Sequence, residues 1–332
     1  MPAPPTDSFQ RKIDYMRLSV TDRCNLRCAY CMPEGGVPKL EHSDILRYEE
    51  LVTLARVAVG MGITKIRVTG GEPLVRKDIL DLCDRISGIP GIRSLSITTN
   101  GVLLAGFAEG LRKAGIKRIN ISLDTLKPER FRSIARMDCH AQVWEGIRAA
   151  EKAGFSPIKL NAVVLRGVND DEIEDLGRLT LHHPYHVRFI EFMPIQPDEA
   201  GNHSRKFVPA SEILDRLKRV APLHVCTEAQ ANGPALHYRF ENAPGKIGII
   251  SPVSEHFCPS CNRLRVTADG KLRTCLFSSE ETDLRQALRE GFPDGQVADI
   301  IRRAIAGKPE KHNLENPVFR KCISRQMSAI GG

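Results

Sequence analysis

Six short β-rich runs, each followed by a segment with helical periodicity, constrain the fold of this 332-residue chain more than any other feature. Such alternation predicts parallel strands joined by helices in one α/β sheet. Six units are fewer than the eight of a closed TIM barrel, so the pattern predicts an open, partial (β/α)6 TIM-like barrel. The predicted strands cover residues 15–20, 65–69, 95–99, 118–123, 159–165 and 186–192.

The segment between the second and third predicted strands shows the helical pattern most clearly. Ile79, Leu82, Cys83 and Ile86 fall at positions i, i+3, i+4 and i+7, which lie along one helix face. This stripe makes Cys83 a packing residue rather than a reactive thiol. Comparable helical character is found at residues 51–59, 103–114, 143–153 and 170–181.

After residue 192 the alternation stops. A polar stretch at 196–204 and a helix at 210–220 precede four short predicted strands, at 224–227, 237–240, 247–250 and 264–267. We therefore expect a barrel over 13–220 and a smaller C-terminal α+β region over 221–332. Residues 1–12 lack the basic start and apolar middle of a signal peptide, and we expect a flexible tail on a cytoplasmic protein.

The charge of the chain favours an anionic partner. A net charge of +8 and a pI near 9.0 suit nucleic acid, an anionic membrane surface or a phosphorylated small molecule. The basic residues are spread along the chain with acidic residues between them, and no RNA-binding signature is present, which disfavours nucleic acid. No stretch approaches the about 18 apolar residues of a membrane span, so we expect no membrane insertion.

The first group of cysteines lies directly after the first predicted strand. Ten cysteines are many for a chain expected in the reducing cytoplasm, where thiols more often bind metals than form disulfides. Cys24, Cys28 and Cys31 lie within eight residues, and no fourth cysteine is nearby. A zinc site or an ordinary cluster needs four ligands. Three thiolates leave one iron of a [4Fe–4S] cluster open to a substrate's amino and carboxylate groups.

The Cys-x3-Cys-x2-Cys spacing, with the aromatic Tyr30 before the last cysteine, resembles the radical SAM superfamily. The partial barrel of that superfamily starts with such a loop. Gly70-Gly71-Glu72-Pro73, after the second predicted strand, resembles its motif for the amino group of S-adenosylmethionine (SAM). Glycine at such a position lets the backbone approach a ligand closely. The resemblance implies a radical SAM barrel that binds a [4Fe–4S] cluster and SAM.

Cys258, Cys261 and Cys275 form a second group, with two residues inside the first pair and thirteen before the third cysteine. One interpretation is a zinc ribbon with His256 as the fourth ligand. Beside a radical SAM loop, three thiolates also suggest a second [4Fe–4S] cluster with an open iron, free to bind something other than SAM.

Both cysteine groups, the Arg-x-Arg between them and the Gly331-Gly332 end resemble the GTP-cyclising radical SAM family of molybdenum cofactor biosynthesis, over essentially the whole chain. The resemblance implies conversion of GTP to (8S)-3',8-cyclo-7,8-dihydroguanosine 5'-triphosphate, the first step of that synthesis. A 5'-deoxyadenosyl radical abstracts hydrogen from the ribose, and no side chain is implied as catalytic acid or base. A reductant protein such as flavodoxin or ferredoxin, a downstream enzyme that forms the cyclic pyranopterin, and a homodimer are also implied.

The same resemblance assigns roles to individual residues. It places the first cluster on Cys24, Cys28 and Cys31, the second on Cys258, Cys261 and Cys275, SAM on Tyr30, Gly71, Ser122 and Met193, and GTP on Arg17, Arg67, Thr98, Lys159, Arg263, Leu264 and Arg265.

Two alternatives stay open. One is another radical SAM enzyme with an auxiliary cluster, such as a peptide-modifying one, against which the Arg-x-Arg and the Gly-Gly end argue. The other is a zinc-ribbon nucleic-acid-binding protein, which leaves the first cysteine loop unexplained. The Gly331-Gly332 end itself could be a frayed tail. Because two glycines can thread a narrow site, we expect them to enter the barrel mouth.

Overall fold

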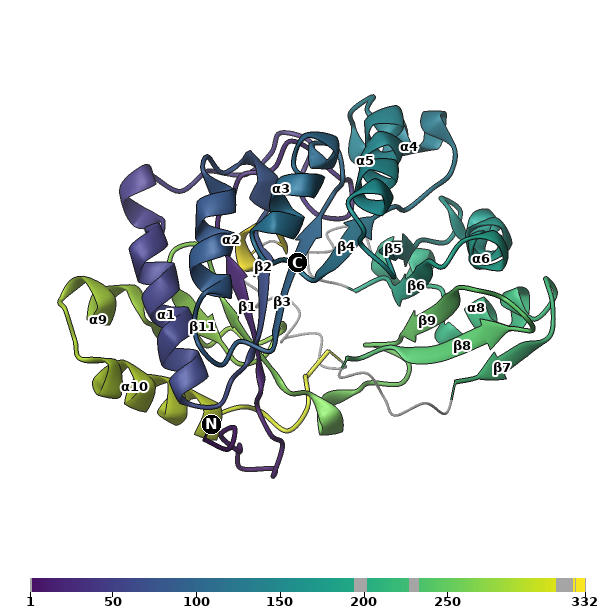
Figure 1. Ribbon diagram of the computed structural model, residues 1–332. Coiled ribbons are helices and arrows are strands. Elements are labelled where there is room, and N and C mark those ends of the chain that lie inside the picture. The colour runs from purple at the N-terminus through teal and green to yellow at the C-terminus, as the bar shows by residue number, and fades with distance from the viewer. Residues whose placement is uncertain (1, 194–201, 227–232, 315–324, 326, 332) are drawn as a thin grey trace.

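The computed structural model describes residues 2–193, 202–226, 233–314, 325 and 327–331. The described strands form one twelve-stranded sheet, with helices packed along its outer face (Figure 1). Its order is β12-β11-β10-β1-β2-β3-β4-β5-β6-β9-β8-β7. The strands from β10 to β9 in this order are all parallel to their neighbours, and the pairs beyond them are antiparallel.

The six predicted barrel strands are confirmed to within one residue at each end. They are β1 (Tyr15–Ser19), β2 (Lys65–Thr69), β3 (Ser94–Thr99), β4 (Arg118–Ser122), β5 (Lys159–Val164) and β6 (His186–Glu191).

The predicted connecting helices are also present, with two differences. The segment 103–114 splits into a 3-10 turn and a short helix, and α4 was not predicted because its apolar stripe contains only Phe131, Ile134 and Ala135. The helices of the barrel are α1 (Tyr48–Gly60), α2 (Ile79–Ser87), α3 (Ala108–Lys113), α4 (Pro128–Ala135), α5 (His140–Lys152) and α6 (Ile173–His182). Single 3-10 turns cover His42–Asp44, Pro73–Val75, Leu104–Gly106, Asp170–Glu172 and Cys258–Ser260.

The C-terminal strands extend the barrel sheet at both edges instead of forming a sheet of their own. β10 (Arg263–Val266) pairs with β1, and β9 (Lys246–Ile250) pairs with β6. The outer strands are β7 (Leu223–Val225), β8 (Leu236–Phe240), β11 (Lys271–Arg273) and β12 (Thr282–Asp283). The remaining helices are α7 (Asn202–Lys206), α8 (Ala210–Leu217), α9 (Arg285–Arg289), α10 (Asp294–Ala306) and α12 (Met327–Ile330).

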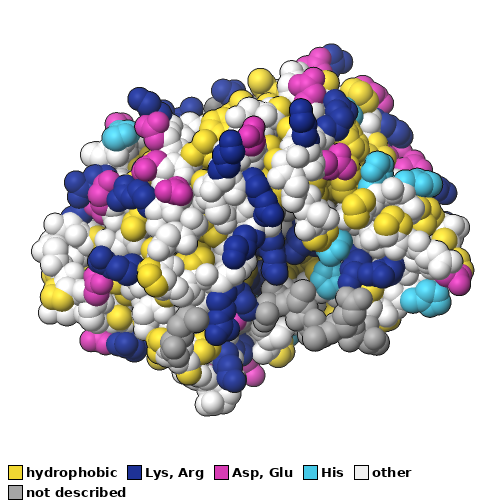
Figure 2. All heavy atoms as spheres, viewed as in Figure 1, with side chains coloured by type: hydrophobic (Ala, Val, Ile, Leu, Met, Phe, Trp, Pro, Cys, Tyr) yellow, Lys and Arg dark blue, Asp and Glu magenta, His cyan; other side chains and the backbone are white. Residues whose placement is uncertain are grey.

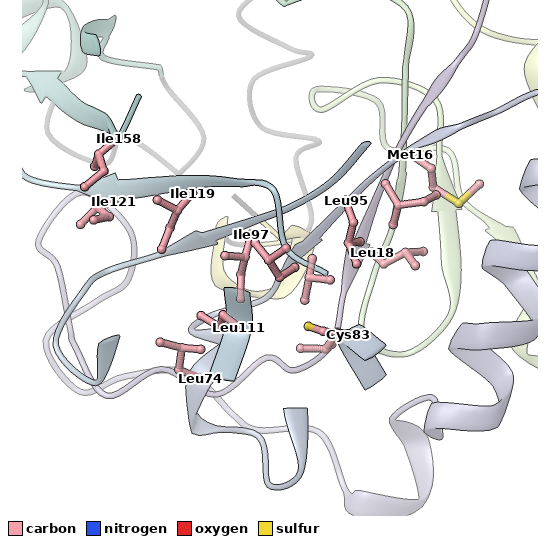
Figure 3. Close-up of a cluster of buried hydrophobic side chains, with 14 of the residues drawn as sticks. Met16, Leu18, Leu74, Cys83, Leu95, Ile97, Leu111, Ile119, Ile121 and Ile158 are labelled. Atoms are coloured by element: carbon pink, nitrogen blue, oxygen red, sulfur yellow. The ribbon is translucent and has the colours of Figure 1, made fainter. Parts of the chain in front are cut away.

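The barrel strands have an apolar outer face and a polar inner face, because alternate residues of a strand point to opposite sides. Met16 and Leu18 of β1 and Ile97 of β3 lie in the buried core between sheet and helices (Figure 3). Cys83 of α2 belongs to the same cluster and is fully buried, which confirms its packing role. Arg17, between Met16 and Leu18, lies on the opposite, inner face.

The structure corrects the expectation that residues 1–12 form a flexible tail, because residues 6–12 make defined contacts. Thr6 and Lys12 form an antiparallel bridge, and Asp7 and Arg11 are buried as an ion pair of 2.6 Å. Sequence patterns missed this because a short loop without periodicity gives no sign of what it packs against. None of the described helices combines the length and the apolar character that a membrane crossing requires.

Candidate active site

The first cysteine triad lies on the loop that leaves the carboxyl end of β1. Backbone hydrogen bonds from Arg27 to Ala135 (3.1 Å) and from Ala29 to Ile134 (2.9 Å) fasten this loop to the end of α4. The amide nitrogen of Asn100 lies 3.8 Å from the sulfur of Cys24. Burial raises the pKa of Cys24 to about 11.

The Gly-Gly-Glu-Pro turn is joined directly to this loop. A Cβ on Gly71 would lie 2.4 Å from the carbonyl oxygen of Arg23, so only glycine fits this close approach. The backbone N–H of Glu72 donates to the same oxygen at 2.9 Å. The buried carboxylate of Glu72 accepts hydrogen bonds from Thr99 (2.8 Å) and the backbone of Asn100 (2.7 Å). The two motifs therefore form one structural unit over the ends of β1, β2 and β3.

Tyr30, another predicted SAM residue, is half-buried and fixed by a hydrogen bond. Its hydroxyl donates a hydrogen bond of 2.7 Å to Asp124, which follows β4. Burial raises the pKa of Asp124 to about 6. Ser122 ends β4 and lies on the same end of the barrel. Three of the four predicted SAM residues thus lie at the end of the barrel that carries the first cysteine triad.

The second cysteine triad lies at the opposite end of the barrel. Cys258 and Cys261 precede β10, which runs parallel to β1, whereas the first triad follows β1. Cys275 follows the antiparallel β11 and returns to the same end. The two triads therefore face each other through the interior of the barrel.

Cations line the inner face between the two triads. The strand register aligns Arg265 of β10 with Arg17 of β1 and Arg67 of β2 in one row. Lys159 of β5 and Arg188 of β6 lie further round the barrel, and Arg188 donates to Asn120 at 2.5 Å. Within the described residues none of these cations has a carboxylate partner, and Nε of both Arg17 and Arg188 is buried without a hydrogen bond.

The pKa values of the inner face show how strong the positive potential is. Burial, together with the charges of neighbouring arginines, lowers the pKa of Arg17 to about 10 and that of Arg188 to about 9, although Tyr15 acts in the opposite direction on both. Burial, followed by Arg188, lowers the pKa of Lys159 to about 7. Burial alone would raise the pKa of the Tyr15 hydroxyl, but Arg67, Arg17 and Arg263 lower it overall. Buried, unpaired cations of this kind fit a polyanionic ligand.

A cavity of about 160 Å³ connects the cation row to the second triad. On the face drawn in Figure 2, Lys and Arg side chains gather around a hollow in the centre of the molecule. Predicted residues that line the cavity are Arg17, Arg67, Thr98, Met193, Cys258, Cys261, Arg263, Arg265 and Cys275. His256, the fourth ligand of the zinc-ribbon interpretation, lines it too. Asn161, Phe257, Phe277, His312 and Met327 also line it, although none of them was predicted as a site residue.

Two predicted GTP residues lie outside this lining. The side chain of Leu264 is fully buried in the hydrophobic core, because it alternates with the inward-facing Arg263 and Arg265. Lys159 begins β5 and lies beside Arg188 and Arg67. Arg188 itself was missed by sequence reasoning. Its signal was the alternation of Val187, Arg188 and Phe189 along β6, which places a cation on the inner face.

The C-terminal segment enters the barrel mouth. The carbonyl oxygen of Gly331 accepts a hydrogen bond of 2.6 Å from Arg265, and a Cβ on Gly331 would lie 2.6 Å from the hydroxyl of Thr69. Burial raises the pKa of Cys31 to about 12, although a backbone hydrogen bond from Ser328 acts in the opposite direction. The predicted entry of Gly331 is thus observed, and Gly332 lies outside the described residues.

The donor set of each triad fits a [4Fe–4S] cluster better than a single metal ion. Among the described residues no three Cys, His, Asp or Glu side chains converge closely enough to hold one ion. A [4Fe–4S] cluster instead binds each thiolate on a different iron. Cys24 and Cys31 act electrostatically on Cys28, as Cys275 and Cys261 do on Cys258, so each triad is a local group.

Comparisons with known proteins agree with this geometry. Residues 18–180 match the Radical SAM superfamily, and residues 185–314 match Molybdenum Cofactor Synthesis C. The chain is 52% identical over 326 residues to the GTP 3',8-cyclase of Moorella thermoacetica. The aligned region covers 98% of this chain and 99% of that protein. This chain belongs to the GTP 3',8-cyclase family. A second member, from Geobacter sulfurreducens, is 50% identical over 331 residues, with the same two coverages.

Membership of the GTP 3',8-cyclase family confirms the predicted class, a radical SAM enzyme. The fold is also similar to that of Streptococcus suis SuiB bound to S-adenosylmethionine, with a TM-score of 0.61 over 86% of this chain and 67% of that one. At 13% identity this likeness shows the radical SAM fold alone.

Proposed function

We propose that this chain is a GTP 3',8-cyclase that converts GTP to (8S)-3',8-cyclo-7,8-dihydroguanosine 5'-triphosphate, the first step of molybdenum cofactor biosynthesis. One observation carries the proposal. Two cysteine triads lie at opposite ends of one barrel, and the interior between them is lined with cations that have no described carboxylate partner. A nucleoside triphosphate supplies the missing negative charge.

At the first end, Cys24, Cys28 and Cys31 would hold a [4Fe–4S] cluster whose fourth iron binds SAM. When bound, this pair supplies one-electron chemistry, namely reductive cleavage of SAM and removal of a hydrogen atom from the substrate ribose. The chain itself contributes position and exclusion of water. Tyr30, Gly71, Ser122 and Met193 are the residues we propose for SAM. Of these, Met193 lines the cavity next to the second triad, so SAM and substrate would share a wall.

The cations on the inner face of the barrel would bind the triphosphate. Arg17, Arg67, Lys159, Arg263 and Arg265 are the charged residues that we propose for GTP, together with Thr98 and the backbone at Leu264. We add Arg188, which is buried and lies close enough to Arg67 and Arg17 for their charges to act on it. Each charge-assisted hydrogen bond to a phosphate contributes about 1.5–3 kcal/mol. Because these cations form no ion pairs with described residues, binding GTP does not require breaking any such pair.

At the second end, Cys258, Cys261 and Cys275 would hold a second [4Fe–4S] cluster with an iron open to the guanine. We also propose that an external reductant protein such as flavodoxin or ferredoxin supplies the electrons, and that a downstream enzyme forms the cyclic pyranopterin from the product. The protein would be a cytoplasmic homodimer. The division at residue 220 stays a prediction.

The test is anaerobic incubation of the reconstituted protein with SAM, GTP and a reductant, followed by chromatographic separation and fragment-mass analysis of the nucleotides, which distinguish the isomeric product from GTP. We expect 5'-deoxyadenosine and a cyclised nucleotide of unchanged mass, with about eight irons per chain for two clusters. Protein that takes up zinc alone, or that consumes SAM without changing GTP, would contradict the proposal. A peptide-modifying activity with no action on GTP would favour another radical SAM enzyme.

A further inference from the structure

Two buried cations bracket the second cysteine triad from outside the substrate cavity. Arg11 is 7% exposed and Lys308 is 3% exposed. Neither side chain lines the cavity, so contact with the substrate does not account for them.

Arg11 ties the N-terminal segment to the first cysteine of the triad. Its guanidinium donates to the carbonyl oxygens of Cys258 (2.9 Å), Glu310 (2.8 Å) and Pro309 (2.7 Å). Its Nε donates to the carboxylate of Asp7 at 2.6 Å. The other carboxylate oxygen of Asp7 accepts the backbone N–H of Arg11 at 3.0 Å, so the guanidinium is held from both sides.

Lys308 reaches the other two cysteines. Its ammonium donates to the carbonyl oxygen of Arg263 at 3.2 Å and to that of Thr274, the residue before Cys275. Each cysteine therefore lies within two residues of a carbonyl held by one of the two cations.

The charge balance of this arrangement is unusual. Asp7 is the one carboxylate that pairs with either cation among the described residues. A buried ammonium is unfavourable unless an anion lies nearby. A cluster held by three thiolates carries net negative charge, and one-electron reduction adds to it. The cluster would thus be the anion that Lys308 lacks.

We propose that Arg11 and Lys308 are positioning residues for the second cluster, which fix its three cysteine segments and raise its reduction potential by their charge. This inference rests on the proposed function in one respect, that the second triad holds a cluster. Hydrogen bonds and charges around the ligands of a cluster set both its geometry and its potential.

The test uses the full chain with Cys24, Cys28 and Cys31 all replaced by Ala, so that all bound iron belongs to the second triad. Lys308→Met removes the charge, Lys308→Arg keeps it, and Lys311→Met is the matched control because Lys311 is exposed. Two quantities are measured under anaerobic conditions, the midpoint potential by an EPR-monitored redox titration and the rate of iron release to a chelator.

We expect Lys308→Met to shift the potential to more negative values and to release iron several-fold faster, while Lys308→Arg stays near the parent and Lys311→Met equals it. Equal potentials and equal release rates for Lys308→Met and Lys311→Met would overturn the inference. If Lys308→Met binds no iron although its circular dichroism is native, the positioning role is supported.

In that case the midpoint potential is measured for Arg11→Met instead, and we expect it to be more negative than that of the control Lys311→Met. A parent chain that binds no iron at the second triad would instead contradict the proposed function, so the two failures are distinguishable.

Discussion

The two cysteine triads have the same number of thiols but opposite surroundings. Around Cys24, Cys28 and Cys31, burial raises the thiol pKa, and the carboxylates of Glu72 and Asp124 raise it further. In the second triad burial also raises the pKa of Cys258, but the cations Arg263 and Lys308 lower the pKa of Cys261 to about 6 despite its burial. The comparison indicates one end arranged around a cofactor with an amino group and one arranged around anions.

The strongest way to test this division is to remove one thiol from the first triad. Cys24→Ala leaves two ligands where the cluster needs three, so we expect no SAM cleavage at all. The measurement is 5'-deoxyadenosine after anaerobic reconstitution, with Cys83→Ala as a control that changes a packing cysteine. Release of 5'-deoxyadenosine above background by the Cys24 variant would remove the first triad from its assigned role.

The matching change at the other end is Cys261→Ser, which has a smaller expected effect. Because the second triad is not needed to break SAM, we expect slow, uncoupled SAM cleavage without cyclised nucleotide. The ratio of 5'-deoxyadenosine to cyclised product measures this uncoupling. Product at the level of the unchanged protein would show that the two ends do not differ in the way described.

The difference in thiol pKa can be measured in metal-free protein by alkylation. A thiolate forms as pH rises through its pKa, so at pH 7 Cys261 is mostly thiolate while Cys24 needs a pH near 11. Allowing for the weaker nucleophile, we expect Cys261 to react roughly a hundred-fold faster at pH 7. Mass mapping of the labelled cysteines gives the rates, and equal labelling across both triads would contradict the contrast.

Arg263→Ala and Arg265→Ala test whether the end of the barrel that carries the second triad binds the triphosphate. Loss of one charge-assisted hydrogen bond corresponds to roughly ten- to hundred-fold weaker GTP binding. SAM binding should change far less, because Tyr30, Gly71 and Ser122, three of the four residues proposed for SAM, lie at the end of the barrel that carries the other triad. Equilibrium binding of both ligands to the reconstituted variants is the measurement. Unchanged GTP affinity in both variants would return these arginines to a structural role.

The smallest expected effect concerns the C-terminal segment at Gly331, which contacts Arg265 of β10 and lies close to Thr69 of β2. Gly331→Ala places a Cβ 2.6 Å from the Thr69 hydroxyl at a positive φ, so we expect Arg265 to lose its carbonyl partner. We expect intact clusters and thermal stability with several-fold slower cyclisation. Gly307→Ala is a control, since a Cβ there meets nothing closer than 3.7 Å. Normal turnover of the Gly331 variant would make the segment dispensable.

The sequence was sufficient for the parts of the site that depend on local spacing. The six barrel strands, the packing role of Cys83 and the position of Gly71 next to the cysteine loop follow from periodicity and motif. Pairing partners do not, because a strand pattern shows two faces but not its neighbours. Three features could therefore be found only in the structure: the pairing of β9 and β10 with the barrel edges, the burial of Arg11 and the position of the two triads at opposite ends.

The rule that active sites gather at the carboxyl ends of barrel strands holds here for one half of the site only. Gly71 and Ser122 obey it, but Arg17 and Arg67 lie in the middle of their strands and Lys159 at the start of β5. The inner face of this barrel is polar instead of filled with branched apolar side chains. A substrate that spans the barrel needs contacts at every level of it, which a rule about one end cannot predict.

The position of β10 has a consequence for how the molecule is made. β1 is synthesised long before one of its two partners, because Arg263–Val266 comes more than 200 residues later in the chain. Until then β1 carries an open edge, and β6 waits in the same way for β9. Open edges invite pairing with other chains. A nascent chain that holds only the six barrel strands is therefore exposed to aggregation at both sides, until β9 and β10 pair with β6 and β1.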